Sequence, residues 1–103
     1  MSFSLIRCDD NGVPVEPIPI IPEELTANCI ATADLYRRVG YALPWVGYAA
    51  VVDGRGVGGG AFVGPPHDGL AELAYYTLKE KEGLGYGSKT AAGLLDIARR
   101  HDP

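Results

Sequence analysis

The chain has 103 residues, of which 47% are hydrophobic and 21% charged, and its formal net charge at pH 7 is −4. This length and composition predict one globular domain, residues 1–103, and exclude a disordered chain, a collagen and a coiled coil. Because an acidic domain repels a phosphate backbone, we expect no nucleic-acid partner. No apolar run approaches the roughly 20 residues of a membrane span, so we expect no membrane partner.

Cysteines and histidines are few and separated along the chain. Cys8 and Cys29 do not form a Cys-x-x-Cys pair, and His67 and His101 stand alone. This spacing predicts no metal site, so both cysteines are interpreted as ordinary core or surface thiols. Met1–Asp10 has no basic segment followed by an apolar one, which argues against a secretion signal. We therefore expect a reduced, cytoplasmic protein.

The first part of the chain predicts a strand, an arm and a helix. Residues 1–21 contain a candidate strand at Ser2–Cys8, a turn signal at 9–12 and a proline-rich arm. The arm is expected to be extended, because proline lacks the N–H group that a central strand needs. Pro22–Val39 is expected to be a helix ended by Gly40. Its apolar stripe consists of Leu25, Cys29, Ala33 and Tyr36.

Three consecutive strands are expected next, at 45–53, 57–63 and 70–78. The turn Asp53–Gly56 is typical of a tight hairpin, and a Pro-rich loop at 64–69 separates the second strand from the third. Three glycines in a row, Gly58 to Gly60, weaken the second strand. They predict either a bulge or a close approach of another segment to this backbone.

A glycine-rich turn, Gly83–Ser88, follows the third strand and opens a helix expected over 88–100. Helix N-termini offer N–H groups without an internal partner and favour anions, and glycine lets a phosphate come close. The order Gly87-Ser88-Lys89 does not fit a P-loop, and the glycine spacing does not fit a Rossmann fingerprint. Two interpretations stay open: a phosphate-binding turn, or simply a tight connection from strand to helix.

Several motifs occur in an order that points to one family. They are Trp45 and Tyr48, Val57–Phe62, Gly64-Pro65-Pro66, Ala71–Tyr75 and Gly83–Lys89. In this order they resemble the central part of the GNAT N-acetyltransferase superfamily, most closely its ribosomal-protein-alanine acetyltransferase branch. The resemblance covers about half of the chain and is moderately specific.

The resemblance implies an acetyl-CoA site and a catalytic base. In the family, the strand before the glycine turn pairs with the pantetheine arm of acetyl-CoA, and the turn binds the pyrophosphate. Glu72 matches a glutamate that in some members activates the acceptor amine through water, since an ammonium has no lone pair. The implied cofactor-binding residues are Tyr76, Thr77 and Leu78 for the thioester, and Gly83, Gly85, Tyr86, Gly87 and Ser88 for the pyrophosphate.

This chain departs from the family pattern in two ways. Glu80 and Glu82 stand where the family prefers arginine or glutamine, although Lys79, Lys81 and Lys89 offset part of their charge. The family also continues past the glycine-turn helix with segments that form the other wall of the cofactor cleft. Without them the Tyr75–Leu78 strand edge is open, so we expect a second copy of the chain to cover it, by edge pairing or exchange of elements.

The expected fold is therefore an α/β, more closely α+β layered, domain with a mainly antiparallel sheet of three or four strands and two principal helices. Residues 1–21 form the first strand and arm, and residues 22–103 resemble a GNAT N-terminal half truncated after the glycine-turn helix. The expected function is acetyl transfer from acetyl-CoA to a primary amine of a small molecule or peptide. The alternatives are a catalytically defective remnant that binds CoA or a protein, and an oligomeric structural protein.

Overall fold

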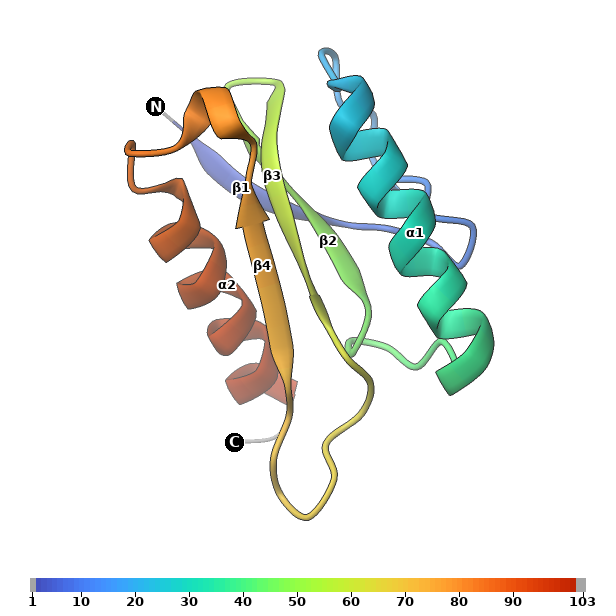
Figure 1. Ribbon diagram of the computed structural model, residues 1–103. Coiled ribbons are helices and arrows are strands. Elements are labelled where there is room, and N and C mark those ends of the chain that lie inside the picture. The colour runs from blue at the N-terminus through green and yellow to red at the C-terminus, as the bar shows by residue number, and fades with distance from the viewer. Residues whose placement is uncertain (1, 102–103) are drawn as a thin grey trace.

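Four antiparallel strands form one sheet in the order β1-β2-β3-β4, and two helices pack against it (Figure 1). The computed structural model describes residues 2–101. The chain is a small α+β domain, which confirms the expected fold class. Its elements are β1 Phe3–Arg7, α1 Glu23–Val39, β2 Gly47–Val52, β3 Arg55–Phe62, β4 Leu73–Thr77, the short 3-10 helix η1 Lys79–Lys81, and α2 Tyr86–His101.

The two helices cover opposite faces of the sheet, as the central strand β2 makes clear. A Cβ atom added to Gly47 would lie 3.1 Å from the Thr32 side chain of α1, and Ala49 packs beside Leu25, also of α1. Ala50, on the other face, belongs to a buried cluster with Val52 and Val57, and Tyr86 of α2 packs against that cluster. Every residue of β2 is buried, because strand alternation directs its side chains into both layers.

Helix α1 agrees with its sequence pattern. It begins at Glu23, with Pro22 as its N-cap, so it starts one residue later than expected. It ends at Gly40, whose φ of 98° few other residues adopt and whose N–H donates to the Tyr36 carbonyl at 2.8 Å. The expected apolar stripe is the buried face.

The β2–β3 connection is tighter than the four-residue turn that was expected. Only Asp53 and Gly54 form the turn, with φ values of 49° and 79°, which is the twist that an antiparallel hairpin favours. One extra residue, Val57, stands between the paired positions Gly56 and Gly58, which is a β-bulge. The expectation of a bulge beside the glycine triplet is therefore confirmed.

β4 is shorter than the strand expected at 70–78. It begins at Leu73, because Asp68 and Gly69 both have positive φ and turn the chain between the bridged residues His67 and Leu70. At its other end η1 interrupts the extended backbone. Helix α2 begins at Tyr86, two residues before the expected start.

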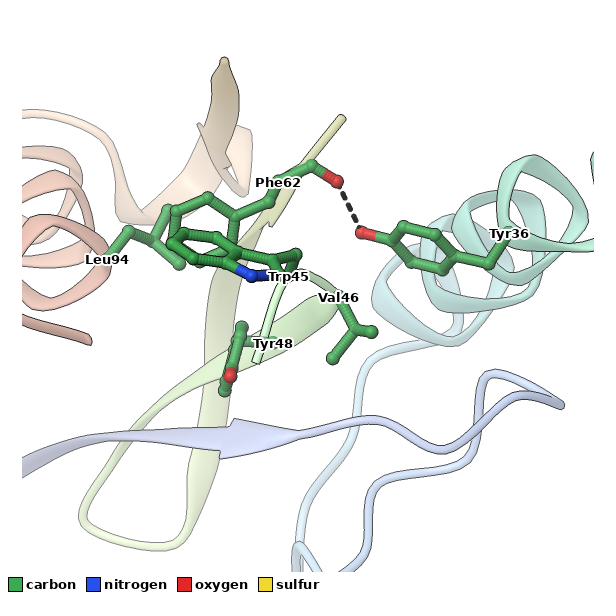
Figure 2. Packing of buried hydrophobic residues seen from close by; sticks show 6 residues of the cluster. All are labelled: Tyr36, Trp45, Val46, Tyr48, Phe62 and Leu94. Atoms are coloured by element: carbon green, nitrogen blue, oxygen red, sulfur yellow. Dashed lines mark hydrogen bonds between the residues drawn. The ribbon is translucent and has the colours of Figure 1, made fainter. Parts of the chain in front are cut away.

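One cluster of large side chains joins both helices through the sheet (Figure 2). Phe62 of β3 is completely buried, and its ring meets Trp45 edge to face with centroids 5.1 Å apart. The Tyr36 hydroxyl donates a hydrogen bond of 2.6 Å to the Phe62 carbonyl and so ties α1 to the end of β3. The whole cluster is Tyr36, Trp45, Val46, Tyr48, Phe62 and Leu94.

We expect Phe62→Ala to lower the free energy of unfolding by about 3–5 kcal/mol, because it empties a fully buried position. Val63→Ala is the matched control, since Val63 is the next residue and is 43% exposed. It should cost less than about 1 kcal/mol. Urea unfolding followed by circular dichroism measures both, and equal losses would contradict this account of the core.

Candidate functional site

The glycine-rich turn before α2 has open space at the Cβ positions of two of its glycines. Gly83 and Gly85 both have φ values of +82°, and a Cβ atom added to either would meet nothing within 4 Å. Gly85 precedes the helix and has no side chain with which to cap it. The Lys89 N–H donates to the Gly85 carbonyl at 3.2 Å, so the N–H groups of Gly87 and Ser88 precede this helical bond. This arrangement suits an anion.

Charged side chains of both signs surround this turn. Lys79, Glu80 and Lys81 form η1, Glu82 follows it, and Lys89 lies in the first turn of α2. All except Lys81, which is half-buried, are exposed. The three lysines outnumber the two glutamates by one, so the side chains around the turn carry a formal net charge of +1.

Strand β4 leads into the turn and lies at the edge of the sheet. Within residues 2–101 it pairs only with β3. The Leu78 N–H donates to the Val57 carbonyl at 2.9 Å, and the Glu72 carbonyl accepts from the Val63 N–H at 2.9 Å, so even-numbered residues use their backbone groups toward β3. Antiparallel alternation then directs the backbone groups of Tyr75 and Thr77 toward the open edge.

The three residues expected along the thioester therefore have different surroundings. Thr77 lies beside α2, because a Cβ atom on Gly87 would lie 3.3 Å from its hydroxyl oxygen. Leu78 is 2% exposed and its N–H is already bonded within the sheet. Tyr76 points to the opposite face, where its hydroxyl would lie 3.0 Å from a Cβ atom on Gly59.

Tyr75, which the sequence placed at the open edge of this strand but not among the cofactor-binding residues, also lies beside the glycine turn. A Cβ atom on Gly87 would lie 3.8 Å from its ring, so Tyr75 shares the α2 side of β4 with Thr77. The ring is about half exposed. The signal was present in the two-residue alternation of the strand, which places residues 75 and 77 on one face.

Glu72, the expected catalytic base, lies away from these residues. It is exposed, directly precedes β4 and lines a surface hollow together with the 63–70 loop. Tyr76 lies four positions further along extended backbone, which is a distance of about 14 Å. The structure thus brings Thr77 and the glycine turn together, but leaves Glu72 toward the opposite end of β4.

A second cavity, of about 290 Å³, lies on the α1 side of the sheet. Tyr76 lines it together with Cys8 and Cys29, and burial raises the pKa of the Tyr76 hydroxyl. The two cysteine sulfurs are only 3.7 Å apart, although 21 positions separate them in the sequence. Their spacing in the sequence, which predicted ordinary thiols, gives no sign of this contact.

Metal and membrane features can be assessed over the described residues, 2–101. In this range no three or more His, Cys, Asp or Glu side chains are grouped to hold a metal ion. No helix there is both long enough and apolar enough to cross a bilayer.

Comparison with known proteins found no matching family model, no matching curated protein and no matching solved structure.

We expect Gly58→Ala to destabilise the edge of the sheet, because the added Cβ atom would overlap the Tyr76 carbonyl of β4. That contact is with backbone, so β4 itself must shift, at a cost of about 1–3 kcal/mol. Gly47→Ala is the control: its Cβ atom would meet only side chains, Thr32 at 3.1 Å and the Tyr36 ring at 3.9 Å. Thermal unfolding and amide exchange in β4 measure the effect, and equal behaviour of the two variants would contradict it.

Proposed function

We propose that this protein is an acetyl-CoA-dependent N-acetyltransferase-like domain that holds CoA at the glycine turn and along the edge of β4. One observation carries the proposal: the open edge of β4 is joined to the N-terminus of α2 by one short connection, residues 78–85, in which Gly83 and Gly85 have open space at their Cβ positions. The pyrophosphate of CoA would accept hydrogen bonds from Gly87, Ser88 and their neighbours in the turn. Gly83 and Gly85 support this binding, because neither carries a side chain in front of the helix.

The pantetheine arm fits the remaining part of the site. It contains two amide groups, and an extended molecule of this kind can add to a sheet edge by backbone pairing. Thr77 and Tyr75 are the residues whose backbone groups turn outward for such pairing. Leu78, whose N–H is occupied, and Tyr76, whose ring points to the other face, would contribute by shape alone.

Acetyl transfer would require a primary amine of a small molecule or peptide, presented in its neutral form. Glu72 is the proposed base, acting through water. We infer that the reaction takes place in the cytoplasm, where thiols such as the two free cysteines of this chain are returned to the reduced state after any oxidation.

A second candidate function is CoA binding without turnover. The distance between Glu72 and the Thr77 end of β4 favours it, because a general base must lie within hydrogen-bond reach of the amine or of one bridging water. In this case the chain would be a CoA-binding module, or would hold a protein partner at the same edge. The two candidates share the binding site and differ only in the role of Glu72.

We expect Gly85→Leu to weaken CoA binding at least tenfold, because the leucine side chain would occupy the space in front of α2. Gly69→Leu is a matched control: Gly69 has a similar φ of +78°, has open space around its Cβ position and lies outside the turn. Titration calorimetry with CoA measures both variants. If Gly85→Leu binds CoA as tightly as the parent protein does, the turn is not the phosphate site.

We expect Glu72→Gln to reduce thiol release from acetyl-CoA by about 10²–10⁴-fold while leaving CoA affinity unchanged, if Glu72 is the base. Asp68→Asn removes a nearby exposed carboxylate from the preceding loop and serves as the control. A parent protein that binds CoA but releases no thiol with any amine supports the second candidate. Unchanged turnover in Glu72→Gln rules out the role of Glu72.

A second copy of the chain is the proposed cover for the Tyr75–Leu78 edge when no CoA is bound. The pantetheine arm and a paired strand would use the same outward backbone groups, so they exclude one another. We therefore expect added CoA to shift a dimer toward monomer in sedimentation experiments. The dimer of the Gly85→Leu variant should not shift toward monomer when CoA is added. A dimer that is indifferent to saturating CoA would show that the edge is not shared.

A further inference from the structure

Two thiols lie in contact in the wall of the α1-side cavity. Cys8 follows β1 and Cys29 belongs to the middle of α1, and they are 5% and 7% exposed. Their sulfur atoms are 3.7 Å apart. Neither takes part in the CoA site proposed above, from which they are separated by the sheet.

The backbone on both sides of this pair is held firmly. The Cys8 N–H donates to the Gly47 carbonyl at 2.9 Å, and the Cys8 carbonyl accepts from the Tyr41 hydroxyl at 2.6 Å. On the other side, the loop after Cys8 packs directly on α1, because a Cβ atom on Gly12 would lie 2.5 Å from the Cys29 carbonyl oxygen. Packing therefore holds the two sulfurs together.

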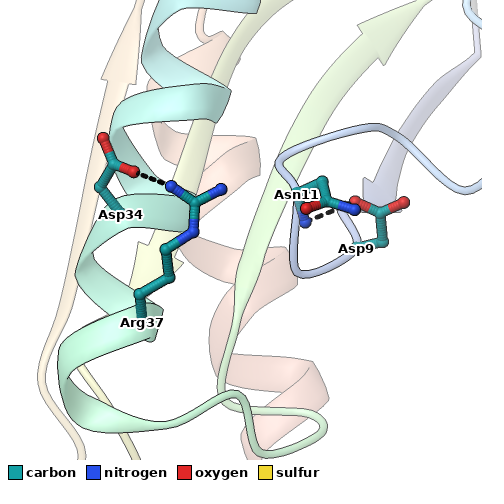
Figure 3. Close-up of polar contacts among 4 residues, drawn as sticks. All are labelled: Asp9, Asn11, Asp34 and Arg37. Atoms are coloured by element: carbon teal, nitrogen blue, oxygen red, sulfur yellow. Dashed lines mark hydrogen bonds and ion pairs between the residues drawn. The ribbon is translucent and has the colours of Figure 1, made fainter.

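The loop itself is closed by an aspartate turn. The Asp9 carboxylate accepts hydrogen bonds from the N–H groups of Asn11 and Val13 at 2.8 and 3.0 Å. Figure 3 shows Asp9 beside Asn11, and on α1 the ion pair between Asp34 and Arg37. This turn shapes the loop that brings β1 and α1 within reach of one another.

The two sulfurs are chemically unequal. The Cys8 thiol donates its hydrogen to the Cys29 sulfur, which lowers the pKa of Cys29 and raises the pKa of Cys8. A thiolate is the reactive form of cysteine, so Cys29 is the nucleophile of the pair and Cys8 is the thiol that follows it. Access is through the cavity, whose size admits small solutes.

We propose that Cys8 and Cys29 are a site of reversible oxidation by hydrogen peroxide, which joins them in a disulfide. The Cys29 thiolate attacks one peroxide oxygen, the O–O bond breaks, and the leaving hydroxide takes up a proton to form water. Cys29 is then a sulfenic acid. The Cys8 sulfur attacks the sulfur of Cys29, the S–O bond breaks, and the released oxygen leaves as a second water with the Cys8 proton.

Atoms and electrons balance in this reaction with the two thiols and one peroxide molecule as the only reactants. The two thiols lose two protons and two electrons, and one peroxide molecule becomes two water molecules. Peroxide is favoured over a larger disulfide oxidant because both residues are more than nine-tenths buried and only a small molecule reaches them through the cavity. The product would tie the end of β1 covalently to α1.

The test treats the parent protein with a small excess of hydrogen peroxide and measures intact mass, free thiols after unfolding, and thermal stability. We expect the mass to fall by two hydrogen atoms, both thiols to disappear together, and non-reducing digestion to yield one Cys8–Cys29 linked peptide. The melting temperature should rise by about 5 °C or more, and dithiothreitol should reverse every change.

Two variants separate the roles of the sulfurs. In Cys8→Ser, whose hydroxyl can still donate to the Cys29 sulfur, peroxide should stop at a sulfenic acid on Cys29 that a dione reagent traps once the chain is unfolded, whereas Cys29→Ala should leave Cys8 largely unreacted. Circular dichroism first establishes that each variant is folded. If a variant does not fold, the peroxide experiment on the parent protein still tests whether the Cys8–Cys29 disulfide forms. Persistence of both thiols at peroxide levels that oxidise free cysteine, or linkage only between separate chains, would overturn the proposal.

Discussion

The absence of side chains at Gly58, Gly59 and Gly60, in the middle of β3, is the constraint on which the arrangement of the other elements depends. Gly58 leaves room for the Tyr76 carbonyl of β4, and a Cβ atom on Gly60 would lie 2.6 Å from the Leu94 side chain of α2. Any larger residue at these positions would push the edge strand or the second helix away. The close approach of β4 and α2 to β3 sets where the glycine turn between them must lie.

The same close packing gives β4 two different faces. Tyr75 and Thr77 lie toward the first turn of α2, whereas Tyr76 passes to the α1 side and lines the cavity there. The proposed anion site and the proposed thiol site thus lie on opposite faces of one sheet. A ligand bound on either face of the sheet would contact the same short strand, β4, which consists of only five residues.

The α1 layer is held by a small number of specific contacts. Tyr36 donates to the Phe62 carbonyl at one end of the helix, and Gly12 abuts the Cys29 carbonyl nearer its middle. Both contacts are made to backbone, so they hold the helix in register with the sheet more strictly than side-chain packing alone would. This register is what brings the Cys29 sulfur to Cys8.

The sequence by itself determined the features that depend on a few neighbouring residues. These are the buried stripe of α1, its end at Gly40, an irregularity at the glycine triplet of β3, and the glycine turn that opens α2. In each of them, backbone sterics and residue periodicity act within one or two turns of chain. For the same reason the antiparallel character of the sheet could be predicted from its tight connections.

Only the tertiary structure decided which distant residues meet. The packing of β4 against α2 placed Tyr75 and Thr77, and not Glu72, beside the glycine turn. Cys8 and Cys29 come together because a loop of β1 packs on one particular turn of α1. Such contacts depend on how whole elements fit against each other, and no local pattern of residues records that fit.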